Sequence, residues 1–135
     1  MKQEIEITIA LRNPLYPVIL ISSDRLYAGS NIKELAYCLI ASYPLDGEDT
    51  IKIIDCTGEE FWYLPEEGIV LPGFTFTRWT KRKIIDLYNE SINSKETGIR
   101  YSIKSLSSKK LSRIVMDICE LIESQENVGS ENNLM

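Results

Sequence analysis

Basic and aromatic residues gather where an amphipathic helix is expected to begin. The sequence from 78 to 83 is Arg-Trp-Thr-Lys-Arg-Lys, in which Thr80 has the side chain of a helix N-cap. The helix macrodipole already places positive partial charge at this end, so cations in the first turn are unfavourable unless solvent screens them or an anion lies against them. Residues of these types could bind an anionic group, and the candidates are Arg78, Trp79, Lys81, Arg82 and Lys83.

The last predicted helix shows the same reversed order of charge. Its first turns are basic, and its end carries Asp117, Glu120 and Glu123, which is opposite to the order that the macrodipole favours. If the fold brings the two helix starts together, they would form one anion-accepting surface. The alternative is that both starts are solvent-exposed turns whose charges are screened. The candidates that this second helix start contributes are Lys109, Lys110 and Arg113.

An acidic protein is the ligand that the overall charge favours for these cations. Basic residues interleaved with Phe74, Phe76 and Trp79 have the composition that binds phosphates and stacks on bases. A net charge of -5 and a pI near 4.8 oppose approach to a polyanion, so a nucleic acid or another anionic ligand is the alternative. An acidic protein partner fits the same cations. If that partner is a second copy of this chain, a homodimer would form through charge-complementary surfaces.

The sequence offers few groups for catalysis, because it contains no histidine and so no imidazole base or triad. Residues 55–58 read Asp-Cys-Thr-Gly, which differs from the Asp-Thr-Gly of aspartic proteases by an inserted cysteine. We interpret Asp55 and Thr57 as turn formers, and Cys56 as a buried strand cysteine without a cationic activator. The protein is therefore expected to be non-catalytic. A histidine-independent enzyme that uses Asp or Glu is the weaker alternative.

No residue pattern in the sequence predicts a metal or a cofactor. The carboxylates of Glu59, Glu60, Glu66 and Glu67 lack the spacing of an EF-hand and are interpreted as a solvated acidic face. There is no glycine-rich phosphate loop of either common type. The three cysteines form no C-x-x-C pair and are expected to be reduced; they are Cys38, Cys56 and Cys119.

Period-two alternation and short apolar runs predict a sheet that would support these groups. Residues 4–11 alternate strictly, and 18–21 form a continuous apolar run typical of a strand covered on both faces. Gly58 is expected to take a positive φ in a hairpin turn. The other predicted strands are 26–28, 50–56 and 60–64, an edge strand or extended loop at 69–71, and a last strand at 99–103.

Three helices are predicted from capping residues and helical periodicity. Asn31 and Glu34 have the spacing of a capping box, which predicts a helix over 32–43. A second helix follows Thr80, and its buried stripe is expected to extend to Ile92, with a loop at 93–98. The third is expected to begin near Ser107 or Ser108 and to end at 123. The polar residues 124–135 are predicted to form a disordered tail.

The length and composition are those of one ordinary folded domain. The chain has 135 residues, of which 44% are hydrophobic and 26% charged. No apolar run approaches the roughly 20 residues that span a bilayer, and the N-terminus lacks a signal-peptide core, so we expect a soluble cytoplasmic protein. The sequence therefore predicts a single α+β domain over 1–123, with a mostly antiparallel sheet of about five to six strands and three packed helices.

Charge is distributed unevenly along the chain. Residues 1–44 carry equal numbers of acidic and basic groups. Residues 45–71 carry eight acidic groups against Lys52 alone, and residues 72–113 carry ten basic groups against three acidic ones. The modest net charge therefore hides a negative segment of minus seven followed by a positive segment of plus seven.

Overall fold

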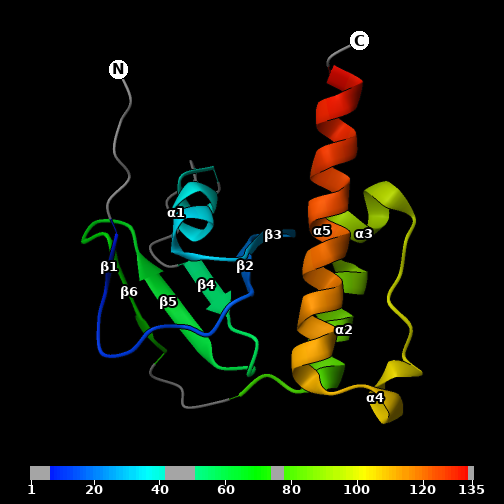
Figure 1. The fold of residues 1–135 in the computed structure, drawn as a ribbon, viewed down its shortest axis with the longest axis horizontal. Helices are drawn as coiled ribbons and strands as arrows, with labels where there is room; N and C mark the ends of the chain where they lie inside the picture. The colour runs from blue at the N-terminus through cyan, green and yellow to red at the C-terminus, as the bar shows by residue number, and fades with distance from the viewer. Residues whose placement is uncertain (1–6, 42–50, 74–77, 134–135) are drawn as a thin grey trace.

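The structure, a computed structural model, describes residues 7–41, 51–73 and 78–133, with side chains described up to residue 125. It is a single-domain α+β fold around a six-stranded sheet with the order β1-β6-β5-β4-β2-β3 (Figure 1). The strands are β1 (Thr8–Ile9), β2 (Val18–Ser22), β3 (Arg25–Gly29), β4 (Ile51–Ile54), β5 (Glu60–Leu64) and β6 (Ile69–Pro72). The helices are α1 (Ile32–Ala41), α2 (Lys81–Glu90), α3 (Ile92–Thr97), α4 (Ser105–Ser108) and α5 (Leu111–Asn133).

The sheet is mostly antiparallel, as the sequence predicts. Every neighbouring pair is antiparallel except β1 and β6, in which Thr8 lies beside Ile69 and Ile9 beside Val70. The described part of the chain contains the three expected long helices and also the short helices α3 and α4. The predicted fold class is confirmed, with two short helices more than the sequence indicated.

Helices cover both faces of the sheet at its central strands. Successive residues of β2 point to opposite faces, so they pack against different helices. Val18 and Leu20 pack with Leu35 and Leu39 of α1 in one core cluster. Ile19 packs in a second cluster with residues of α2 and α5, among them Ile118. The strand is buried on both faces, which explains its continuous apolar sequence.

The start of α1 confirms the predicted cap in a slightly altered form. The Asn31 side chain accepts a hydrogen bond from the Glu34 N–H at 2.9 Å, as an N-cap residue does. The Glu34 carboxylate accepts from the N–H of Ser30 at 3.4 Å instead of from that of Asn31. The described part of α1 ends at Ala41, and the predicted last residues 42 and 43 lie outside the described residues.

The first strand is shorter than the alternation over 4–11 predicts. Only Thr8 and Ile9 pair with β6, and the expected residues 4–6 lie outside the described part of the chain. Leu11 has a left-handed backbone with φ 73°, and the Arg12 N–H bonds to the Ala10 carbonyl, so the extended chain ends there. β6 therefore lies between β5 and β1, and its prediction as an edge strand is wrong.

Most of the predicted loop at 93–98 is helical, because residues 93–97 belong to α3. The Ser91 hydroxyl accepts a bond from the Ser94 N–H at 3.3 Å and caps this helix, while the Ser91 N–H bonds to the Tyr88 carbonyl at the end of α2. Gly98 ends α3 with a left-handed φ of 73°. Ser91 therefore ends α2 and begins α3. Ile92, which was predicted to extend the buried stripe of α2, is the first residue of α3.

The predicted last strand at 99–103 is wrong. The main chain of Tyr101 is hydrogen-bonded to the side chain of Asn89 in α2 and not to a strand. Asn89 accepts from the Tyr101 N–H at 2.7 Å and donates to the Tyr101 carbonyl at 3.0 Å. Tyr101 is buried, whereas Ile99 and Ile103 are about half exposed. The segment therefore runs as an extended chain along the helices.

The last helix begins later and continues further than expected. Residues 105–108 form α4, so α5 begins at Leu111 and not near Ser107 or Ser108. It continues to Asn133, through the polar residues for which the sequence predicts a tail. The division into a domain over 1–123 and a disordered tail over 124–135 is not tested by the fold and stays a prediction.

Candidate functional site: the shared start of α2 and α5

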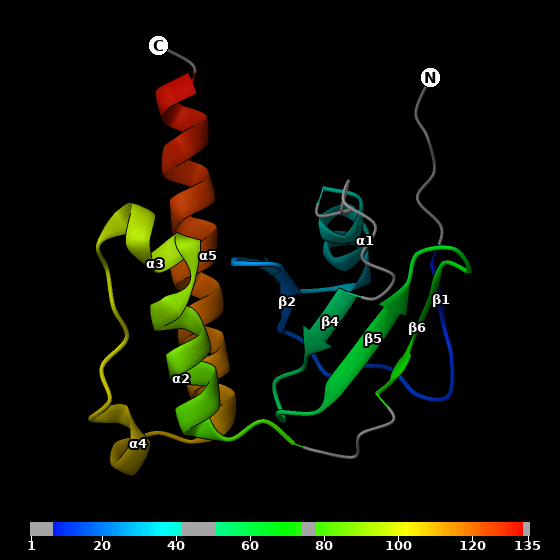
Figure 2. The same cartoon turned by 180° about the vertical axis from the view of Figure 1, so that it is seen from behind.

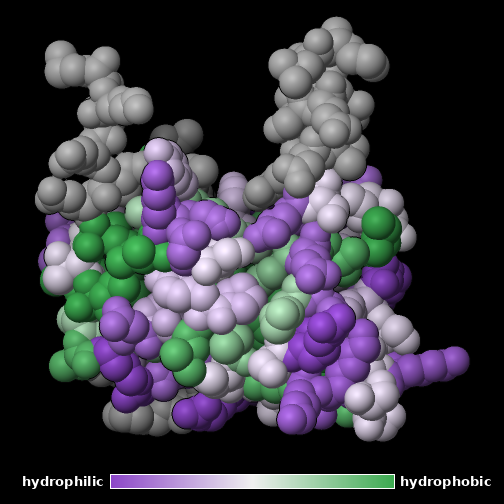
Figure 3. All heavy atoms as spheres, viewed as in Figure 1, coloured by the Kyte–Doolittle hydropathy of each residue, from purple (hydrophilic) through white to green (hydrophobic). Residues whose placement is uncertain are grey.

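The starts of α2 and α5 lie side by side at one end of the molecule. Both helices run in the same direction and begin at the lower end in Figures 1 and 2. The hairpin turn between β4 and β5 contacts both starts, since a Cβ at Gly58 would lie 2.7 Å from the Trp79 carbonyl oxygen and 2.8 Å from Leu111 Cδ2. Figure 3 shows hydrophilic side chains gathered over the first turns of α5. We call this region the basic end; its cations are Arg78, Lys81, Arg82, Lys83, Lys109, Lys110 and Arg113.

The start of α2 has the predicted N-cap. Thr80 is extended and its hydroxyl accepts a bond from the Lys83 N–H at 3.2 Å. Arg82 forms an ion pair with Asp86 at 3.3 Å, and the Lys81 ammonium donates to the Leu106 carbonyl at 3.3 Å. Within the described residues, no hydrogen bond or ion pair engages the Lys83 side chain, so its charge faces solvent.

Trp79 has a packing role that the sequence analysis did not anticipate. Its indole N–H donates to Glu60 Oε1 at 3.0 Å, and the indole of Trp62 donates to Glu60 Oε2 at 2.6 Å. Trp79 is half-buried and packs against the core cluster of α2 and α5. The buried Glu60 carboxylate therefore fixes the segment that leads into α2.

A polar cluster centred on Asp117 engages two of the cations at the start of α5. Asp117 Oδ2 accepts from the Lys109 ammonium at 2.8 Å and from the Tyr101 hydroxyl at 2.7 Å. Asp117 Oδ1 lies 3.1 Å from Arg113 Nε. Lys109 and Arg113 are therefore largely neutralised within the protein, whereas the described residues give Lys110 no such partner.

The same cluster lowers the pKa of Asp117. Burial alone would raise this pKa, but the hydrogen bonds from Lys109 and Tyr101, together with the charges of Lys109 and Arg113, outweigh it. The pKa of Lys109 is raised, mainly by its hydrogen bond to Asp117. The Tyr101 pKa is also raised, first by burial and then by the hydrogen bond to Asp117. All three shifts favour the protonation states that hold the cluster together at neutral pH.

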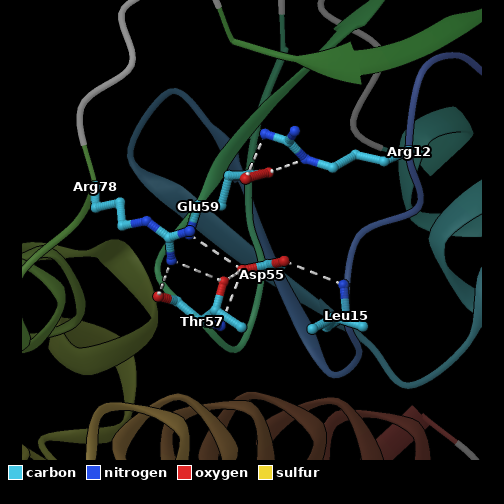
Figure 4. A network of polar contacts seen from close by, with 6 residues as sticks. All are labelled: Arg12, Leu15, Asp55, Thr57, Glu59 and Arg78. Carbon is cyan, nitrogen blue, oxygen red and sulfur yellow. Dashed lines mark hydrogen bonds and ion pairs between the residues drawn. The ribbon is translucent and has the colours of Figure 1, made fainter.

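A polar hollow lies next to the basic end, with Arg78 in its wall. Its volume is about 360 Å³. Figure 4 shows Arg12 and Arg78 reaching toward it from opposite sides, with Asp55 and Glu59 between them. The residues that line it are Arg12, Asn13, Leu15, Asp55, Thr57, Glu59 and Arg78.

The carboxylates of this hollow are already engaged. Arg12 holds Glu59 with two hydrogen bonds of 2.8 and 2.6 Å. Asp55 is buried and accepts from the N–H groups of Leu15, Thr57 and Glu59 at 2.9 to 3.1 Å. The Thr57 hydroxyl also donates to Asp55 at 2.6 Å, which confirms that these two residues form a turn.

The described residues of the hollow provide no free base or nucleophile. Asp55 and Glu59 have their oxygens in hydrogen bonds, and Arg78 donates only to the carbonyl and hydroxyl of Thr57, at 3.3 and 3.4 Å. Burial raises the pKa of the Cys56 thiol, which disfavours the reactive thiolate. Cys56 lies half-buried in the turn after β4, not within a buried strand as predicted. The arrangement suits binding better than bond-breaking chemistry.

Sequence reasoning missed Arg12 as part of this region. Its ion pair with Glu59 joins residues 47 positions apart, and no local spacing points to such a contact. The only local signal was the turn at Asp55 and Thr57. Arg78, by contrast, was among the sequence candidates, and the structure places it between the hollow and α2.

The negative segment 45–71 does not form one acidic surface among its described residues. Asp55, Glu59 and Glu60 are engaged inside the protein by the contacts above. Glu66 and Glu67 are exposed at the turn between β5 and β6, and the acidic residues before 51 lie outside the described part of the chain. Charge counted along the sequence therefore overstates the charge presented at the surface.

Two further features are absent from the described part of the chain. It contains no group of three or more Cys, Asp or Glu residues arranged to hold a metal ion. None of its helices is both long enough and apolar enough to cross a membrane.

Searches against protein-family models, curated proteins and solved structures find no match for this chain.

Proposed function

We propose that this chain is a non-catalytic interaction protein that binds an acidic protein partner at the basic end. The observation that supports the proposal is the adjacency of the two helix starts, which gathers cations from separate parts of the sequence. Within the described residues, four of these cations have no carboxylate partner and are available to a ligand: Arg78, Lys81, Lys83 and Lys110.

The contacts of the remaining candidates define their roles in the proposal. Arg82, Lys109 and Arg113 share their charge with Asp86 or Asp117, so they contribute to the field around the site more than to direct contacts. Trp79 positions the start of α2 through Glu60. The direct contacts are therefore assigned to the four cations without carboxylate partners.

A protein partner is favoured over a nucleic acid by the contacts of Trp79; Phe74 and Phe76, the other aromatic residues of the predicted patch, lie outside the described residues. Base stacking needs an accessible aromatic face, whereas Trp79 is half-buried against the core and its N–H is engaged by Glu60. The net charge of -5 also opposes a long polyanion more than a short acidic segment. Nucleic acid remains the alternative ligand for the same cations.

A non-catalytic role is supported by the groups in the hollow. Catalysis without histidine would need a carboxylate with a free oxygen or an activated thiol. The Asp55 and Glu59 carboxylates are occupied by hydrogen bonds, and the pKa of Cys56 is raised. The hollow is therefore assigned a structural and binding role.

Titration with a fluorescent glutamate-rich peptide tests this function. The double variant Lys83→Ala/Lys110→Ala is expected to weaken binding about three- to tenfold at low salt, because each exposed ion pair contributes up to about 1 kcal/mol. The matched control is Lys33→Ala/Lys95→Ala, which removes the same charge at exposed positions of α1 and α3 and should bind nearly as the wild type does.

Two outcomes would count against the proposal. Equal loss of affinity in both double variants would mean that the peptide responds only to net charge. Tighter binding of single-stranded or duplex DNA, with the same dependence on Lys83 and Lys110, would assign the basic end to nucleic acid instead.

A further inference from the structure

The two edges of the sheet differ in how they are closed. At the β3 edge, Asn93 of α3 accepts from the Leu26 N–H at 2.8 Å and donates to the Leu26 carbonyl at 3.0 Å. The Ile92 N–H also bonds to the Asp24 carbonyl at 2.9 Å. These contacts occupy the main-chain groups that another strand would need, so β3 is protected against strand addition.

The β1 edge is open among the described residues. The N–H groups of Thr8 and Ala10 bond to Gly68 and Val70 at 2.9 and 2.8 Å, so these two residues face β6. Main-chain groups of successive residues in a strand point to opposite sides, and those of Ile7 and Ile9 therefore point away from the sheet. Figures 1 and 2 show no described element beyond β1 on this side.

The side chains at this edge suit another strand in the same layer. Ile7 and Ile9 pack against the α1 core cluster and would continue it across an added strand. Thr8 is exposed on the opposite face, and Leu11, where the strand ends, is 85% exposed. The alternating pattern in the sequence covers residues 4–11, whereas only the two residues of β1 pair with β6.

Self-complementarity favours a second copy of the chain as the occupant. In an antiparallel pair with a two-fold axis at Thr8, Ile7 of each copy lies opposite Ile9 of the other. The described residues 7–10 carry no charged side chain, so no like charges face each other in this register. It uses residues that β6 already keeps extended, and it ends where Leu11 turns away.

We propose that two copies of this chain pair through their β1 edges in this register and form one continuous sheet. Only the short segment around Thr8 is in contact, so the dimer is weak and concentration-dependent. The β1 edge and the basic end lie on different sides of the molecule (Figure 1). Pairing therefore leaves both basic ends accessible.

Charge variants at Thr8 test the register directly, because Thr8 faces itself across the axis at the close spacing of a non-hydrogen-bonded pair. Sedimentation velocity over a concentration series should show that Thr8→Glu and Thr8→Lys each weaken the dimer, by about fivefold. An equimolar mixture of the two variants should restore or exceed wild-type association. Ser124→Glu and Ser124→Lys change the net charge equally at an exposed position of α5 and serve as controls.

Amide hydrogen exchange gives an independent measurement. The N–H of Ile9 should become more protected as protein concentration rises, whereas that of Thr8, which already bonds to Gly68, should not. A wild-type protein that stays monomeric at every concentration, or concentration-independent exchange at Ile9, would overturn the proposal. Tighter association of Thr8→Lys alone would overturn this register.

Discussion

Asp117 shows how one carboxylate can stabilise several parts of this small protein. It accepts hydrogen bonds from Tyr101 in the extended segment and from Lys109 just before α5, and it pairs with Arg113 within α5. Its side chain is 14% exposed, so solvent screens these contacts less than it screens the pair of Arg82 and Asp86. Removing its charge should therefore be felt in the stability of the whole domain.

The variant Asp117→Asn is expected to lower the free energy of unfolding by about 1–3 kcal/mol at pH 7, because hydrogen bonds to a charged group are lost. The Asp117 pKa is lowered below its ordinary value of 3.8, so its contribution is present above that value and is lost as pH falls through the lowered pKa. The difference between wild type and variant in urea unfolding should therefore shrink progressively as the pH falls below 3.8.

The matched control is Asp86→Asn, which removes an exposed ion pair on α2 and should cost only about 0.5 kcal/mol. A stability difference for Asp117→Asn that is the same at pH 7 and at low pH would contradict the ionic origin of its effect.

At the scale of elements, two asparagine side chains make the main-chain hydrogen bonds that a neighbouring strand would otherwise make. Asn89 of α2 pairs with the main chain of Tyr101, and Asn93 of α3 pairs with that of Leu26. Both side chains are buried. The helices that cover the sheet therefore also satisfy main-chain groups that no strand satisfies, which is why α3 protects the β3 edge.

Asn93→Ala is expected to lower the free energy of unfolding by about 2–4 kcal/mol, because it leaves both the N–H and the C=O of Leu26 without partners in a buried position. Hydrogen exchange at the Leu26 amide should accelerate beyond what the loss of global stability predicts. Both effects are measured in one experiment by native-state exchange.

Asn31→Ala is the comparison, since it removes the N-cap of α1 at a cost of about 1 kcal/mol and does not touch β3. If Leu26 exchanges equally fast in both variants after correction for stability, Asn93 does not close this edge.

At the scale of the whole molecule, the proposed contacts occupy separate surfaces. The basic end lies where α2 and α5 begin, and the β1 edge lies on the far side of the sheet (Figure 1). No described residue belongs to both regions. Dimer formation and binding of an acidic partner should therefore be thermodynamically independent.

Peptide titrations of Thr8→Glu and wild type at equal concentration are expected to give the same intrinsic affinity, with one peptide bound per chain. Conversely, Lys83→Ala/Lys110→Ala should leave the dimer dissociation constant unchanged. Isothermal titration calorimetry and sedimentation measure the two equilibria. A shift of more than about threefold in either direction would indicate coupling between the surfaces.

Local signals in the sequence determined much of the fold. The N-caps Thr80 and Asn31, the hairpin at Gly58 and the buried strand β2 were each predicted from residues within a few positions of one another. Such features depend on backbone preferences and side-chain periodicity, which involve only residues close together in the sequence. The segment 78–83 was recognised as a candidate site for the same reason.

Only the tertiary structure decided which of these groups are available to a partner. Tyr101 pairs with an asparagine and not with a strand, Arg12 engages Glu59 from 47 positions away, and Asp117 neutralises Lys109 and Arg113. The fold also placed the starts of α2 and α5 together, and it leaves the β1 edge without a neighbouring strand among the described residues. Hydrogen bonds and ion pairs between distant residues depend on distances in space, and spacing along the chain does not determine those distances.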